Sequence, residues 1–280
     1  MSRADTMIPL LQVPWRDHRG ERLPVTPLPP LSSETIEHLD LQWTGTVTAE
    51  MRKLLERSCG ISGTPLGCVD FTGCWHPEEP LAIFRPSITL AIDADGRRWI
   101  AEVGRKRGLP GPVWCVFPRP EVAMFVDRSL ADFLIRLHGR IRRNSFSQWV
   151  SSLHSNARTL WATCQACAIP VPIAFARLRE LRGWLAELPI NAWVYDLRSP
   201  GRRRGLPYGL AHERGGWYRC GRLPVFALVG RATPAVSVPM HDAPVEATEP
   251  VEPGRGLPEA IAEILGCDPD ELRPKSSERR

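Results

Sequence analysis

Apolar and polar residues alternate in the runs between residues 87 and 126, and this period of two is the clearest structural signal in the chain. Alternate positions of a strand share one face of a sheet. Turn-forming sequences separate the runs: Ala94-Asp95-Gly96, the basic loop 105–112, and Phe117-Pro-Arg-Pro. The pattern predicts three or four antiparallel strands in a meander. The positions expected to share a face within each run are Ile88, Leu90 and Ile92; Trp99, Ala101 and Val103; Val113, Cys115 and Phe117; and Val122, Met124 and Val126.

A helix signal follows the meander directly. Ser129-Leu-Ala-Asp132 resembles a capping box, with Asp where Glu or Gln is usual. The apolar stripe of the helix is formed by Leu130, Phe133, Leu134 and Leu137. We expect this helix to lie on the sheet and the first domain to end near Gly139.

Two short helices are predicted before the meander. Ser33 is a candidate helix start, with Ile36 and Leu39 on one face. The second helix carries Val47, Met51, Leu54 and Leu55 on one face and ends at Gly60. Residues 61–80, rich in Gly, Thr and Pro, are expected to be a loop, and the Pro-rich residues 1–30 an extended arm.

The second half of the chain carries weaker signals. Residues 147–164 and 173–188 have helical periodicity, whereas NAWVYDL and RLPVFALVG favour strands around an Arg- and Gly-rich loop. Residues 232–256 have a linker's composition, and LPEAIAEILG is typical of a short amphipathic helix.

The predicted fold class is therefore α+β: an antiparallel meander flanked by helices, followed by a smaller Arg-rich α+β segment. We expect four segments: the arm over 1–30, a first domain over 31–139, the Arg-rich segment over 140–231, and an acidic, Pro-rich linker with a short helix over 232–280.

Composition narrows the class of protein. The 280 residues are 43% hydrophobic, which is enough for a substantial core, and the net charge is +5. The chain has no apolar run of membrane-spanning length, and its start lacks a signal-peptide pattern, so a cytoplasmic protein without a membrane partner is expected. Residues 139–230 hold 14 basic and 4 acidic side chains, whereas residues 231–280 hold 6 and 10. This asymmetry indicates at least two structural units.

Motifs for catalysis and metal binding are missing from the sequence. The chain has no GxSxG, HExxH, GxxxxGK[ST] or GxGxxG motif, and its seven His residues lie far apart. Cys164 and Cys167 form a CxxC without a second pair at zinc-site spacing, so the eight Cys are expected to be free thiols. His212-Glu213-Arg214 is interpreted as a solvated loop. We expect no catalytic residue, no metal and no cofactor.

Residues 31–139 resemble the SUKH superfamily, the Smi/Knr-like proteins that include many bacterial toxin-immunity proteins. The resemblance rests on the helix TVTAEMRKLLERSCG, the runs AIDADGRRWIAEVG and PVWCVFPRPEVAMFV, and the closing helix SLADFLIRL. It implies an α+β fold without catalysis and tight binding of a cognate toxin domain, that of a secreted or contact-dependent effector, which is thereby blocked in the producing cell or its siblings.

This resemblance predicts that the protein covers the toxin's active site with a sheet face and two flanking loops, residues 72–79 and 105–108. Exposed Trp and Arg dominate the energetics of many protein interfaces. The expected toxin contacts are Trp75, Arg105, Lys106 and Arg107, with Arg202, Arg203 and Arg204 of the second segment extending the surface.

The Arg-rich segment leaves other functions open. Phosphate groups are bound by Arg clusters, and single-stranded bases stack on aromatic rings, so nucleic-acid binding is one alternative. An intracellular adaptor that meets an acidic protein surface is another. The same residues also have an explanation without nucleic-acid binding. The Arg content then reflects a coding bias, and the aromatic rings point inward as the core of strands. The relevant side chains are Arg140, Arg142, Arg143, Arg198, Arg202, Arg203, Arg204, Trp193, Tyr195, Tyr208, Trp217 and Tyr218.

Overall fold

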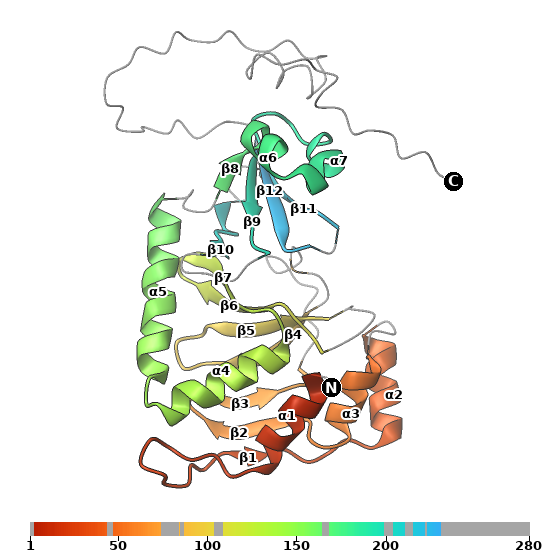
Figure 1. The fold of residues 1–280 in the computed structure, drawn as a ribbon, viewed down its shortest axis with the longest axis vertical. Helices are drawn as coiled ribbons and strands as arrows, with labels where there is room; N and C mark the ends of the chain where they lie inside the picture. Colours follow the sequence, from red (N-terminus) through yellow and green to blue (C-terminus); the bar gives the residue numbers. More distant parts are fainter. Residues whose placement is uncertain are drawn as a thin grey trace. The chain divides into compact units, whose positions relative to one another are not determined.

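The computed structural model has an α+β architecture built from antiparallel sheets and helices (Figure 1). It divides into two compact units: residues 1–167 with 197–209, and residues 168–196 with 210–280. The structure describes residues 3–43, 47–73, 84, 87–103, 109–163, 168–198, 204–210, 215–221 and 223–230.

The first unit contains a five-stranded antiparallel sheet, which confirms the predicted meander. The strands lie in the order β10-β7-β6-β5-β4. Their bounds are β4, Ser87–Ile92; β5, Arg98–Glu102; β6, Val113–Pro118; β7, Glu121–Asp127; and β10, Gly205–Leu206. The register places Trp99 opposite Cys115 and Cys115 opposite Met124, so positions predicted to share a face in separate runs meet in one core.

The prediction that Ile92 shares a face with Ile88 and Leu90 is wrong. The pairing of β4 with β5 shifts register between Thr89 and Ala91. Such a bulge breaks the period of two. Leu90 and Ala91 are both buried as a result, whereas Ile92 is 58% exposed.

A second, three-stranded sheet occupies part of the segment expected to be a loop. Its order is β1-β2-β3, with β1 at Thr26–Pro27, β2 at Gly60–Thr64 and β3 at Gly67–Asp70. The loop prediction for residues 61–70 is wrong because Ile61 and Val69 pair across the hairpin and are buried in the core. Gly63, with φ of +74°, adopts a left-handed conformation that glycine tolerates best.

Five helices complete this unit among the described residues. Their bounds are α1, Arg3–Gln12; α2, Ser33–Gln42; α3, Ala49–Leu55; α4, Leu130–Arg142; and α5, Phe146–Thr163. The predicted opening of α4 is confirmed, since Ser129 Oγ accepts a hydrogen bond from the Asp132 amide and donates one to Asp132 Oδ2. At α2 the capping side chain is Ser32, one residue before the predicted start.

The expectation of an extended N-terminal arm is wrong for residues 3–12. This segment is helix α1 although Pro9 lies inside it. Met7 and Leu11, one turn apart, are buried in the core, and their burial favours a helix despite the proline.

The first unit continues beyond the position expected to end a domain. Helix α4 runs through Gly139 to Arg142, and α5 buries Trp149, Val150 and Leu160 in the same core as the meander. Residues 197–209 also belong to this unit, because β10 pairs with β7.

The second unit has a four-stranded antiparallel sheet in the order β11-β12-β9-β8. The predicted helix over 173–188 is divided into α6, η2 and α7, because Leu178 leaves the helical conformation with φ of −102° and ψ of 67°. The bounds are β8, Ala168–Pro170; α6, Val171–Arg177; η2, Arg179–Leu181; α7, Arg182–Leu185; β9, Trp193–Asp196; β11, Gly215–Arg219; and β12, Val225–Gly230.

Two further expectations concern membrane-spanning helices and the C-terminal segment. None of the helices in the described residues has the length and apolar character needed to cross a membrane. The expected linker and helix after residue 231 lie outside the described residues.

Candidate functional site

Most of the expected toxin contacts lie outside the described residues. These are Trp75, Arg105, Lys106, Arg107, Arg202 and Arg203. The CxxC residues Cys164 and Cys167, expected to be free thiols, also lie outside the described residues. Arg204 is described: it is half-buried, and its carbonyl accepts a 2.9 Å hydrogen bond from the Phe125 amide. Its backbone therefore belongs to the sheet of the first unit. Of the two expected contact loops, Thr72 and Gly73 are described.

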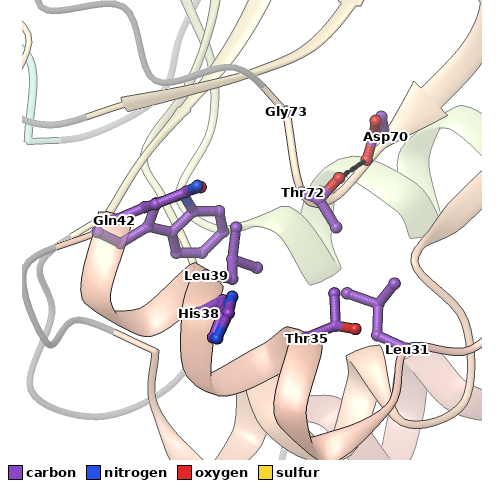
Figure 2. Close-up of a pocket in the computed structure, with 9 residues that line it drawn as sticks. Leu31, Thr35, His38, Leu39, Gln42, Asp70, Thr72 and Gly73 are labelled. Atoms are coloured by element: carbon purple, nitrogen blue, oxygen red, sulfur yellow. Dashed lines mark hydrogen bonds between the residues drawn. The ribbon is translucent and has the colours of Figure 1, made fainter.

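Those two residues border a groove of about 350 Å³ in the first unit (Figure 2). The side chains of helix α2 form one wall, and the turn that follows β3 forms the other. The lining residues are Leu31, Thr35, His38, Leu39, Gln42, Trp43, Asp70, Thr72 and Gly73.

The spacing along α2 explains the first wall. Positions i, i+3, i+4 and i+7 lie on one side of a helix, and they are occupied here by Thr35, His38, Leu39 and Gln42. The buried Leu39 anchors the helix to the core, as does Trp43, whose exposed fraction is 1%. The exposed side chains of His38, Gln42 and Thr35 are thereby held along the groove.

The second wall is a turn organised by Asp70. Asp70 Oδ1 accepts hydrogen bonds from the Thr72 amide at 2.7 Å and from Thr72 Oγ1 at 2.6 Å. Figure 2 shows this pair opposite helix α2. Since both bonds use Oδ1, the other oxygen, Oδ2, is not engaged by the described residues.

Gly73 allows this turn to approach the neighbouring strand. A Cβ atom at this position would lie 2.0 Å from the Thr89 carbonyl oxygen of β4. Only glycine fits such a close backbone approach. The groove wall is therefore fixed to the edge of the five-stranded sheet.

The thiols near Asp70 are not activated nucleophiles. Burial raises the pKa of Cys59, and the Asp70 carboxylate raises it further. The same two causes raise the pKa of Cys68. Because thiolate rather than thiol is the nucleophile, the raised pKa favours the less reactive thiol form of both groups.

The groove is suited to binding through shape and polar contacts. Its floor is apolar, and its sides offer an imidazole, an amide and a carboxylate, which can donate to or accept from a partner. Within the described residues, no group of three or more His, Cys, Asp or Glu side chains is placed to hold a metal ion.

The aromatic residues considered for nucleic-acid binding lie in different environments. Tyr195 is 1% exposed and makes an edge contact with Trp217 at 5.1 Å, and Tyr208 is 5% exposed. Tyr218, at 54%, is exposed. The burial of Tyr195 and Tyr208 therefore supports the interpretation that these rings belong to the core. Arg140 lies over the ring of Trp149, with its guanidinium carbon 6.0 Å from the ring centre.

Comparison with known proteins gives no match to a family model, to a curated protein or to a solved structure. Function is therefore argued from the residues of this chain.

The sequence interpretation missed the groove residues on α2. A local signal for them exists, because polar Thr35, His38 and Gln42 lie beside the apolar stripe at helical spacing. A second signal is the sequence Asp70-Phe-Thr72, because an Asp side chain can accept a hydrogen bond from the backbone amide two residues later and so stabilise a turn. The juxtaposition of α2 with this turn depends on tertiary packing, which neither signal reports.

Proposed function

We propose that the protein is a non-catalytic immunity protein that binds a cognate bacterial toxin and occludes it. The observation that carries this proposal is the order of elements in the first unit: the helical pair α2 and α3, the antiparallel meander β4 to β7, and the capping-box helix α4. This is the order on which the resemblance to SUKH immunity proteins rests.

The site is compatible with inhibition by steric cover. A preorganised surface loses little conformational entropy on binding, and it can exclude water and substrate from a partner's active site without chemistry. The groove has two rigid walls, one on α2 and one tied to β4 through Gly73.

The test is co-expression with each toxin domain found to be encoded beside this gene. The proposal expects restored growth of toxin-expressing cells and a stoichiometric complex in size-exclusion chromatography. An unrelated toxin of the same chemical class serves as the specificity control and should remain lethal. Failure of the protein to bind or protect against any neighbouring toxin would contradict the proposal.

Nucleic-acid binding remains the alternative and makes a different prediction. It expects a gel shift that weakens steeply with salt and disappears when Arg202, Arg203 and Arg204 are neutralised. The burial of Tyr195 and Tyr208 favours the protein-binding proposal, since a buried ring cannot stack on a base.

A further inference from the structure

We propose that the groove between α2 and the turn after β3 docks a basic segment of a partner protein, one that inserts a large apolar side chain. The inference rests on the proposed function, because that partner would be the toxin. It goes further by naming the surface used and the chemistry of the segment recognised.

The floor of the groove is apolar. Leu31, Leu39 and Trp43 line it, and these side chains can pack on an inserted apolar group. Leu39 and Trp43 are themselves buried in the core, so the floor is held in place before a partner binds.

The groove lining favours a cationic partner, because Asp70 is acidic and none of the lining side chains is Lys or Arg. The sequence between Arg22 and Arg52 contains Glu34, Glu37, Asp40 and Glu50 and neither Lys nor Arg. The sequence from Ser58 to Gly73 contains Asp70 and again neither Lys nor Arg. Every lining residue belongs to one of these two segments.

The whole chain has 36 Lys and Arg against 31 Asp and Glu, so these two segments differ from it in charge. Opposite fields steer partners together and penalise wrong ones. A basic segment is therefore favoured at the groove, whereas the phosphate backbone of a nucleic acid is repelled there.

Polar groups inside the groove can orient such a segment. Asp70 Oδ2 can accept a hydrogen bond from a Lys or Arg side chain, because the Thr72 contacts use Oδ1. The amide of Gln42 can pair with the backbone of an extended peptide. Figure 2 shows Gln42 and Thr72 on opposite sides of the groove.

The test selects peptides with the full-length protein. A phage library of random dodecapeptides is panned on the wild type, and the enriched peptides are then synthesised and titrated by fluorescence anisotropy. We expect enriched peptides to carry several Lys or Arg around one large apolar residue. Their affinity should fall when the salt concentration rises.

Two variants with the same change of charge locate the site. Gln42→Lys places a repelling cation in the groove lining, and it should weaken binding at least tenfold. Val13→Lys alters an apolar residue that is 61% exposed outside the groove lining, and it should stay within twofold of the wild type. Far-UV circular dichroism checks that both variants are folded.

The outcomes separate this inference from the proposed function. No enrichment, enrichment of peptides without Lys or Arg, or equal losses in the two variants would overturn the groove assignment. In the toxin-protection assay, Gln42→Lys should lose protection that Val13→Lys keeps; equal protection by both would remove the groove from the toxin contact while leaving immunity intact. If the wild type protects against no toxin but the peptide results hold, the proposed function fails and the basic-segment site stands.

Discussion

The hydroxyl of Tyr208 donates a hydrogen bond of 2.9 Å to the backbone carbonyl oxygen of Phe117, across 91 positions of sequence. Both residues are buried, and Tyr208 lies two residues after strand β10. This bond and the pairing of β10 with β7 attach residues 204–209 to the meander. A segment that the sequence assigns to the Arg-rich region therefore belongs to the sheet of the first unit.

Substitution of Tyr208 by Phe should destabilise this unit by about 1–2 kcal/mol. The change keeps the ring but leaves the buried Phe117 carbonyl without this donor, and an unsatisfied buried acceptor has a cost of that order. Urea unfolding of the wild type and the variant measures the difference. Tyr218→Phe is the control and should be nearly neutral, because Tyr218 is exposed. Equal effects of both changes would contradict the assignment.

Gly205 should not tolerate a methyl group. A Cβ atom there would lie 2.8 Å from the Ala123 carbonyl oxygen and 2.9 Å from a methyl carbon of Leu160. Gly205→Ala should therefore destabilise the protein by about 1–3 kcal/mol, the usual cost of overpacking. Gly183→Ala in α7 is the matched control, since no atom lies within 4 Å of the added carbon. There the thermal midpoint should stay the same or rise, because alanine favours a helix.

The sequence predicts the parts of the fold that local patterns report. Alternation locates β4 to β7, and Ser129 with Asp132 locates the start of α4. Strand β10 has two residues and contributes no alternation, so its pairing with β7 follows from tertiary contacts alone. Helix α1 is missed because proline is a strong local signal, whereas burial of Met7 and Leu11 depends on the rest of the core.

The candidate site is predictable to a smaller extent. Interface reasoning favours exposed Trp and Arg, and it selects Trp75 and the loop 105–108, which lie outside the described residues. The groove is lined by apolar and polar residues, with Asp70 as the acidic one, and no chemical motif marks them. The absence of Lys and Arg in both of its segments is visible in the sequence, but it gains meaning once α2 and Asp70 are known to face the same space.

Asp93 should be the main stabilising side chain of the hairpin between β4 and β5. Its Oδ1 accepts the amides of Asp95 and Arg97, each at 3.1 Å, and its Oδ2 accepts Arg97 Nε at 2.7 Å and Trp99 Nε1 at 3.2 Å. Asp93→Ala leaves these donors without the carboxylate and should cost about 2–3 kcal/mol in urea unfolding.

Asp95→Ala is the control within the same turn. Asp95 also pairs with Arg97, at 2.5 Å, but its side chain is 69% exposed, and exposed pairs contribute about 0–1 kcal/mol. If both substitutions have the same effect, the hydrogen bonds of Asp93 do not stabilise the hairpin.

Asp127 should make stability fall as pH rises from about 4 to about 6. Burial raises the pKa of this carboxyl to about 6, against the opposing effect of Arg136, which bonds both carboxylate oxygens at 3.0 Å. Between the ordinary value of 3.8 and about 6, the folded state binds more protons than the unfolded state, so the unfolding free energy decreases with pH. The contribution is present below pH 4 and is lost above pH 6; its full size is about 3 kcal/mol.

Asp127→Asn does not titrate, so the stability of the wild type relative to this variant should fall by that amount across the window, as measured by urea unfolding at pH 4, 5, 6 and 7. The control is Asp95→Asn, which changes an exposed carboxylate and should follow the wild-type pH profile. If the profile of Asp127→Asn also runs parallel to that of the wild type, Asp127 titrates normally and the prediction is wrong.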